Sequence, residues 1–274
     1  MKIIDFKIGS DPEYGVINEN NKPISAVGKV GGTKSVPLTI GNGCNRQEDG
    51  VAVEFCIPPT TTKEEFLQYL NYCELKGNEL LNPMGLKLCA TSSFIYDDEE
   101  LKSKQAQTLG CSSSYDAYTG DEQSPSIKNA GNMRTMGFHI HVGFKMPEDV
   151  CPEDIMNFIK YMDMYVGLPS ILIDKDVIRR NLYGKAGDYR VRIIDEDLVI
   201  EYRSLGGSLL QSNETKGWVY DSTLIAIENF NNQTKLIPDD LLQEAINHSN
   251  INLTNQLIDE YNIKTLSSSL RVTT

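Results

Sequence analysis

The chain of 274 residues carries 26 basic and 38 acidic side chains, which gives a formal net charge of −12 at pH 7. A chain this anionic is unsuited to bind a nucleic-acid backbone, because that requires phosphates to be neutralised, although a local basic cluster can still hold a nucleotide. Hydrophobic residues make up 40% and charged residues 23%, and no apolar run approaches the roughly 20 residues that span a bilayer, so we expect a globular protein without a membrane span.

The N-terminus and the cysteines bear on where the protein works. Asp5 and Lys7 interrupt the apolar residues at the start of the chain, which is wrong for the core of a signal peptide. No pair of cysteines forms C-x-x-C, so we expect reduced cysteines that mostly pack in the core, not a zinc site or a disulfide framework. Six cysteines are concerned: 44, 56, 73, 89, 111 and 151. These features predict a cytoplasmic protein.

The first part of the chain predicts one strand and a long loop. Residues 4–8 alternate apolar and polar side chains, as a half-buried strand does. They run into Asp11-Pro12-Glu13, which by itself favours a turn because Asp-Pro often opens one. Residues 28–45 are rich in glycine and are expected to be loop. They do not form a P-loop, since Thr33 separates the glycines from Lys34 and no helix pattern follows.

The next segments predict a strand, a helix and a second loop. Residues 51–57 alternate again and place Glu54 on the polar face. Thr62-Lys-Glu-Glu65 is a capping box that opens an amphipathic helix, and Gly77 is expected to end it. Residues 104–132 are polar and rich in Ser, Gly and Asn, and a loop of that length is often a lid or a binding loop.

The clearest strand is predicted at residues 138–144. Its apolar residues alternate with His139 and His141, and glycines flank the two histidines on the same face. Two of the three histidines of the chain therefore lie side by side with space around them. The pair alone is equally compatible with metal ligands and with an ordinary exposed strand face.

Helices and two more strands complete the pattern. Pro152 sits in the first turn of a helix that extends to about residue 166. Residues 190–193 and 199–203 read as strands, and residues 214–263 as mostly helical with a break at Pro238. Strands scattered among helices, without strict β-α-β alternation, predict an α+β fold with an antiparallel sheet. We expect a single domain over residues 1–274, with the motifs in about 1–210 and a helical part in about 211–274.

The polar faces of these strands carry residues suited to chemistry. Carboxylates and an imidazole that converge on a sheet are costly to bury unless a cation joins them, and an oxygen-rich set suits Mg²⁺ or Mn²⁺. Arginine side chains suit phosphate oxygens. Taken alone, each residue is at least as well explained by a turn, an exposed face or an ion pair as by a functional site. Because all of them lie opposite the apolar residues of their own strand, a joint site is the better interpretation. The set comprises Asp11, Glu13, Glu54, His139, His141, Arg190, Arg192, Glu201 and Arg203.

In their order along residues 1–210, the motifs resemble the phage-type carboxylate–amine (COOH.NH2) ligases, a branch of the glutamine synthetase and glutamate–cysteine ligase superfamily. The segments that carry the resemblance are Ile8-Gly-Ser-Asp-Pro-Glu13, Gly31-Gly-Thr-Lys34, Gln47-Glu-Asp-Gly-Val-Ala-Val-Glu-Phe55, Gly137-Phe-His-Ile-His-Val-Gly143, Arg180 with Tyr183-Gly-Lys-Ala-Gly-Asp-Tyr-Arg190, and Glu201-Tyr-Arg203. The resemblance implies a glutamine synthetase-like catalytic domain, with a mainly antiparallel, curved sheet and helices on its outer face.

The resemblance also implies a role for each residue. It assigns the two divalent metals to Asp11, Glu13, Glu54, His139 and Glu201. It assigns ATP binding to His141, Lys185, Arg190 and Arg192. Arg203 would contact the γ-phosphate or the acyl phosphate, and Glu54, in a second role, would receive the proton of the incoming amine.

The implied reaction uses ATP and Mg²⁺ or Mn²⁺ to activate a carboxylate as an acyl phosphate, which an amine then attacks to form an amide. The substrates would be small molecules or peptides, including amino acids derived from the cell wall, and a phage-encoded enzyme would work in the host cytoplasm. An oligomer is compatible with the resemblance. Two alternatives stay open: a guanidino phosphotransferase, and an inactive virion-associated or binding protein that keeps the ligase fold.

Overall fold

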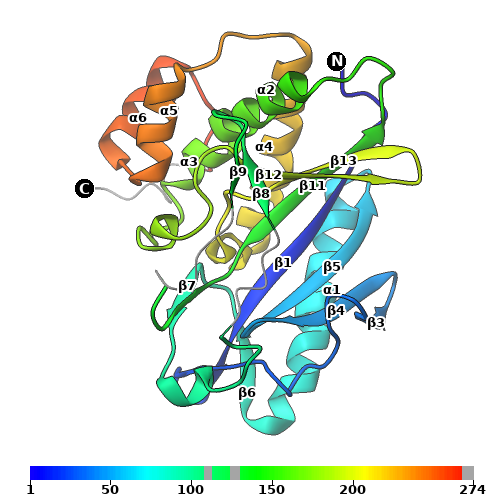
Figure 1. Ribbon diagram of the computed structural model, residues 1–274, viewed down its shortest axis with the longest axis vertical. Helices are drawn as coiled ribbons and strands as arrows, with labels where there is room; N and C mark the ends of the chain where they lie inside the picture. Colours follow the sequence, from blue (N-terminus) through cyan, green and yellow to red (C-terminus); the bar gives the residue numbers. More distant parts are fainter. Residues whose placement is uncertain (108–112, 124–129, 267–274) are drawn as a thin grey trace.

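The computed structural model describes residues 1–107, 113–123 and 130–266, and Figure 1 shows their arrangement. The strands of this part are β1 (Lys7–Asn18), β2 (Pro23–Ile24), β3 (Leu38–Gly41), β4 (Cys44–Asp49), β5 (Ala52–Thr60), β6 (Leu86–Cys89), β7 (Ser93–Ile95), β8 (Ser114–Asp116), β9 (Glu122–Gln123), β10 (Met133–Thr135), β11 (Phe138–Lys145), β12 (Asp188–Ile194) and β13 (Asp197–Tyr202). The α-helices are α1 (Lys63–Leu81), α2 (Pro152–Met162), α3 (Leu168–Ser170), α4 (Asn213–Asn231), α5 (Asp239–Asn247) and α6 (Ile251–Glu260).

One large antiparallel sheet organises the molecule. Its strand order is β3-β4-β5-β1-β11-β13-β12-β8-β9, while β2 and β6 pair with further parts of β1. The long strand β1 runs through the middle, between β5 and β11 (Figure 1). The separate pair β7–β10 is also antiparallel. This mixed arrangement confirms the predicted α+β class and its antiparallel sheet.

The two faces of the sheet differ because side chains alternate along each strand. One face is apolar and packs against α1, α2 and α4 in the main hydrophobic cluster. Phe66 of α1, for example, lies 6.3 Å from Phe138 of β11 between ring centroids. A second cluster joins α5 and α6 to the segment that follows α2. The opposite face is polar, so the helices leave it open for a site.

The first strand differs from its prediction. It begins at Lys7 and continues through Asp11-Pro12-Glu13 to Asn18, so the tripeptide is strand and not a turn. Hydrogen-bonded and non-hydrogen-bonded pairs alternate along an antiparallel ladder. Here the amide of Glu13 donates to the carbonyl of Gly137 (2.9 Å). Pro12, opposite Phe138, therefore occupies a position at which the ladder to β11 requires no N–H.

The predicted helix after residue 62 is present but longer than expected. Thr62 caps it, with its hydroxyl accepting from the amide of Glu65 (3.2 Å). Gly77 was predicted to end the helix, and this is wrong, because the helix runs on to Leu81. A Cβ at position 77 would lie 2.5 Å from Leu88 and 2.9 Å from Phe55. Glycine is therefore used there to bring α1 close to the sheet.

The two predicted loops contain strands. Residues 28–45 include β3 and the start of β4, which pair with each other. Their glycine-rich part is fixed to β4 because Glu48 accepts from the amides of Gly28 and Gly31, both at 2.9 Å. Of residues 104–132, positions 108–112 and 124–129 lie outside the described residues, and the rest includes β8 and β9.

Most of the other predicted features are present in the structure. The helix at Pro152, the strands β11, β12 and β13, and the C-terminal helices with a break before Asp239 are confirmed. No helix of the described residues is long and apolar enough to cross a bilayer. The described cysteines are free; Cys44 and Cys73 are buried as expected, whereas Cys56 and Cys151 are exposed. Cys111 lies outside the described residues.

Candidate active site

The polar face of the sheet contains a pocket of about 230 Å³. It collects side chains from β1, β4, β5, β11, β12, β13 and the loop before β3. The lining residues are Asp11, Glu13, Lys34, Pro37, Asn45, Gln47, Asp49, Glu54, Cys56, His139, Arg190, Arg192, Glu201 and Arg203. All the predicted site residues except His141 and Lys185 are in this set. The parity of each strand thus brings them together as the sequence predicted.

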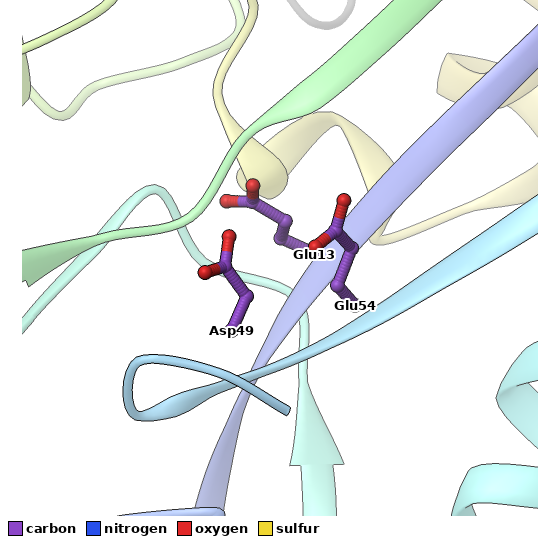
Figure 2. A group of neighbouring side chains, drawn as sticks. All are labelled: Glu13, Asp49 and Glu54. Carbon is purple, nitrogen blue, oxygen red and sulfur yellow. The ribbon is translucent and has the colours of Figure 1, made fainter. Parts of the chain in front are cut away.

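Three carboxylates meet at one end of the pocket: Glu13, Asp49 and Glu54 (Figure 2). Glu13 and Glu54 face each other across β1 and β5, and the β4–β5 hairpin brings Asp49 beside them. One oxygen of each lies within 4.8 Å of the others. Burial, followed by the charge of Asp49, raises the pKa of Glu13 to about 7. The same two causes raise the pKa of Glu54 well above its usual value.

A second group is formed around His139. Its Nδ1 lies 3.9 Å from Oε1 of Glu13 and 3.6 Å from Oε1 of Glu201. Burial, and next the charge of Arg203, lowers the pKa of His139, so the imidazole is neutral and able to act as a ligand. Glu13 is therefore shared between this group and the three-carboxylate group.

The basic side of the pocket converges on Glu201. Arg190 Nη1 lies 3.2 Å and Arg192 Nη2 lies 3.4 Å from Oε2 of Glu201. Arg203 contacts Oε1 of the same carboxylate. Two of these guanidiniums come from β12 and the third from the end of β13. Together they supply planar sets of N–H donors, from which phosphate oxygens accept hydrogen bonds.

Three of the predicted residues occupy other surroundings. His141 lies on the polar face but outside the pocket lining, with Nε2 3.5 Å from Oδ2 of Asp11. Asp11 lines the pocket yet lies outside the three-carboxylate group. Lys185 is exposed, does not line the pocket, and contributes its carbonyl to the hydroxyl of Ser204 (2.7 Å).

Prediction from the sequence missed Asp49 and Lys34. The Lys34 ammonium lies 3.1 Å from Asp49, and although burial acts to lower its pKa, Asp49 and Glu54 raise it overall. The signal for Asp49 was present: Asp-Gly between two strand-like runs is typical of a hairpin turn. Placing such a hairpin would have put Asp49 next to Glu54.

The donor sets fit divalent cations. Carboxylate oxygens in a cluster raise one another's pKa, and a cation of charge two would replace the protons that such a cluster holds. The two groups together offer mainly oxygen and one imidazole nitrogen, a set that suits Mg²⁺ or Mn²⁺. The side chains that would hold such ions are Glu13, Asp49, Glu54, His139 and Glu201.

Solved structures align with this chain along most of its length. A structure titled "Apo GmaS without ligand" superposes with a TM-score of 0.51 at 9% identity, and covers 97% of this chain and 66% of its own. "GmaS/ADP complex-Conformation 1" gives a TM-score of 0.49 at 11% identity, with the same coverages. "Crystal structure of novel glutamine synthase homolog" gives 0.44 at 10%, covering 93% of this chain and 66% of that one. The chain thus spans 66% of the length of these structures, and the likeness to the first of them, at a TM-score of 0.51, is one of fold alone.

The family is shown by the sequence. The model of the phage phiEco32-like COOH.NH2 ligase-type 2 family matches residues 128–269, more than half of the chain, and the chain belongs to this family. No curated protein matches it. The resemblance drawn from the motifs is therefore confirmed at the level of the family.

Proposed function

We propose that this protein is an ATP-dependent ligase that joins a carboxylate to an amine through an acyl phosphate. One observation carries the proposal: a single pocket holds two acidic ligand groups that share Glu13, directly beside three arginines. Phosphoryl transfer requires such a combination, because metal ions and guanidiniums neutralise charge on the phosphate oxygens. Membership of a family of COOH.NH2 ligases supports the same class of reaction.

Divalent cations are proposed to occupy the acidic end of the pocket. Glu13, Asp49 and Glu54 would hold one ion, and Glu13, His139 and Glu201 the other. Ions bound there would supply positive charge to the phosphate oxygens of ATP. Every other part of the reaction is assigned to side chains of the chain itself.

The arginines are proposed to bind the triphosphate and the transferred group. Arg190 and Arg192 point into the pocket from neighbouring positions of one face of β12. Arg203 is almost fully buried, so its charge is poorly screened and acts strongly on a nearby phosphate. We assign Arg203 to the γ-phosphate and then to the acyl phosphate.

Glu54 is proposed to receive the proton that the amine loses when it attacks the acyl phosphate. Its side chain is buried, faces the pocket, and accepts a 2.6 Å hydrogen bond from the side-chain amide of Gln47. That bond holds the carboxylate in place at the pocket. Expulsion of phosphate then leaves the amide. The reacting acid and amine are expected to be small molecules or the ends of peptides.

Ligand-dependent thermal stability tests the binding half of the proposal. ATP with Mg²⁺ is expected to raise the melting temperature, and His139→Ala and Glu201→Ala are expected to abolish the increase. His248→Ala is the matched control, because His248 is exposed at the C-terminal end of α5 and lies outside the pocket. A wild-type protein that Mg²⁺ and ATP leave unchanged would favour a retired scaffold instead.

Product analysis tests the chemistry. ADP release is expected to require both a carboxylate and an amine, and mass spectrometry of peptide or metabolite pools incubated with ATP should show condensation products lighter than their parts by one water. A phosphorylated guanidine as the product would contradict the ligase and indicate a guanidino kinase.

A further inference from the structure

Tyr183 occupies an unusual position beside the pocket, in contact with residues of the site. Two buried arginines lie over its ring, with the guanidinium carbon of Arg203 5.2 Å and that of Arg179 5.4 Å from the ring centroid. Its hydroxyl lies 3.5 Å from Nε2 of His139. The tyrosine is itself buried, with 7% of its surface exposed. One side chain thus contacts both a proposed metal ligand and the proposed phosphate-binding arginine.

The surrounding segment is built to hold this tyrosine. Arg179 is fully buried and donates to the carbonyls of Ser204 and Leu205, both at 2.9 Å. The carbonyl of Arg179 in turn accepts from the amide of Tyr183 (2.9 Å). Gly184 has a positive φ of 72°, and a Cβ there would overlap the Arg179 guanidinium. Through Arg179, Tyr183 is therefore tied to the residues that directly follow β13, which include Arg203.

A hydroxyl suits the two states that His139 must adopt. Without metal, Nδ1 of His139 faces the carboxylates of Glu13 and Glu201, so a proton on Nδ1 is favoured and Nε2 accepts. If a metal bound Nδ1, that nitrogen would be unprotonated, and Nε2 would carry the proton and donate. A tyrosine hydroxyl can donate to Nε2 in the first state and accept from it in the second, which a carboxylate or a carbonyl cannot do.

We propose that Tyr183 is a positioning residue that fixes the His139 imidazole through its hydroxyl and the Arg203 guanidinium through its ring. A planar guanidinium over an aromatic face is attracted and held flat. The partner of the second ring nitrogen of a metal-binding histidine commonly sets the orientation of the ring, and its loss weakens metal binding. The role rests on the proposed function, since it presumes that His139 binds a metal and Arg203 a phosphate.

Tyr183→Phe tests the hydroxyl while it keeps the ring. Nitrogen-15 NMR of histidine-labelled protein is simple to assign because the chain has three histidines. In metal-free protein the substitution is expected to shift the Nε2 signal of His139 and leave the signals of His248 in place. Tyr14→Phe is the matched control: Tyr14 is buried on the opposite face of the sheet, and its hydroxyl has no hydrogen-bond partner among the described residues.

Metal titration supplies the second measurement. Tyr183→Phe is expected to weaken Mn²⁺ binding about tenfold, in the range seen when the partner of a metal-binding histidine is removed, and Tyr14→Phe to leave it unchanged. Tyr183→Leu removes the ring as well, so it should also reduce the thermal stabilisation by ATP and Mg²⁺ beyond the loss in Tyr183→Phe.

The outcomes separate this inference from the proposed function. Unchanged His139 signals in metal-free Tyr183→Phe, or unchanged Mn²⁺ affinity, would overturn the role of the hydroxyl. ATP stabilisation in Tyr183→Leu equal to that in Tyr183→Phe would overturn the role of the ring. Absence of Mn²⁺ binding in the wild type would contradict the proposed function, whereas the metal-free NMR measurement would still decide whether Tyr183 holds His139.

Discussion

Two glycines in helices of this protein lie in opposite surroundings. Gly77 of α1 faces the sheet, where a Cβ would lie 2.5 Å from Leu88 and 2.9 Å from Phe55. Gly217 of α4 has room, since the nearest atoms to a Cβ there are Lys63 Cδ at 3.5 Å and Leu67 Cδ1 at 3.8 Å. The helix interior favours alanine over glycine by about 1 kcal/mol at both positions. Packing therefore decides whether alanine raises or lowers the free energy of unfolding at each position.

We expect Gly77→Ala to lower the free energy of unfolding by about 1–3 kcal/mol, as overpacking of a core does. Gly217→Ala is expected to leave the free energy of unfolding unchanged or raise it by up to about 1 kcal/mol. Urea unfolding of both variants measures the difference. Equal effects of the two substitutions would show that the contact between α1 and the sheet is not close.

Asp163 is a buried carboxylate outside the pocket. It accepts hydrogen bonds from the hydroxyls of Tyr202 (2.7 Å) and Tyr118 (2.9 Å) and from the amide of Gly187 (2.6 Å). Burial outweighs these bonds, with a smaller contribution from the charge of Asp116, and raises the pKa of Asp163 to about 7. Asp163 thus joins the segment after α2 to the start of β12 and the end of β13, the strands that carry the arginines.

The raised pKa of Asp163 predicts a pH-dependent stability. Between the pKa in the unfolded chain, about 3.9, and the folded value of about 7, the native state binds a proton that the unfolded state does not, so the free energy of unfolding falls as pH rises. Asp163→Asn removes this titration. The difference in unfolding free energy between wild type and variant should therefore decrease from about pH 4 to 7 and stay constant above; urea unfolding at each pH measures it. A difference that is constant across this range would contradict the prediction.

At the scale of elements, the β4–β5 hairpin completes the acidic group. Its register pairs Gln47 with Glu54 and Asp49 with Ala52, which places Asp49 at the turn, beside Glu13 of the neighbouring strand. The hairpin also anchors the loop that carries Lys34, because Glu48 accepts hydrogen bonds from two backbone amides of that loop. The hairpin thus supplies the acidic side chain of Asp49 and holds in place the loop that supplies the basic side chain of Lys34.

Asp49→Asn is expected to weaken Mn²⁺ binding by at least about tenfold, because it removes a charged ligand of the kind that Mn²⁺ prefers. Asp97→Asn serves as control, since Asp97 is exposed, pairs with Lys22 at the surface, and lies outside the pocket. Isothermal titration calorimetry with Mn²⁺ provides the comparison. Equal affinities of the two variants would exclude Asp49 from the metal-binding set.

At the scale of the whole molecule, the order of the strands sorts charge across one sheet face. Strands β4, β5 and β1 carry the acidic group, whereas β12 and the end of β13 carry the arginines. β11 lies between the two halves with His139. The three arginines converge on the carboxylate of Glu201. A metal ion would thus compete with the arginines for Glu201, and a phosphate would compete with Glu201 for the arginines.

This arrangement predicts that the effect of Glu201→Gln on ATP affinity changes sign when a metal is present. In EDTA the variant is expected to bind ATP more tightly than the wild type, because the arginines no longer pair with a carboxylate. With Mg²⁺ it should bind ATP more weakly, because a metal ligand is missing. Binding titrations under both conditions measure the coupling, which for linked sites is commonly about 5–150-fold. Weaker binding of the variant in EDTA as well would contradict the ion-pair account.

Strand parity accounts for the part of the site that could be predicted. Once 51–57, 138–144, 190–193 and 199–203 are strands, alternation alone sends their apolar residues to the helices and their polar residues to the other face. His139 and Arg203 follow from this without knowledge of the fold. Lys185 did not, because it lies in a loop, where no periodicity determines the direction of a side chain.

Contacts distant in sequence were beyond such reasoning. Gly77 reads as a helix end from its local sequence, and only its contact with β6 explains why the helix continues. Tyr183 lies outside the strands, so no periodicity predicts the direction of its side chain, and its contacts with Arg179 and Arg203 depend on how the segment folds back onto β13. Asp49 was within reach, since its turn signal is local.

The amino-acid sequence by itself determined the α+β class, the strands that bear the site, and the family, because periodicity and ordered motifs are local properties of the chain. Only the tertiary structure decided that Glu13 serves two acidic groups, that Asp49 completes one of them, and that the arginines converge on Glu201. These facts depend on strand order and register, and register is set by packing between segments more than a hundred residues apart, such as β1 and β11.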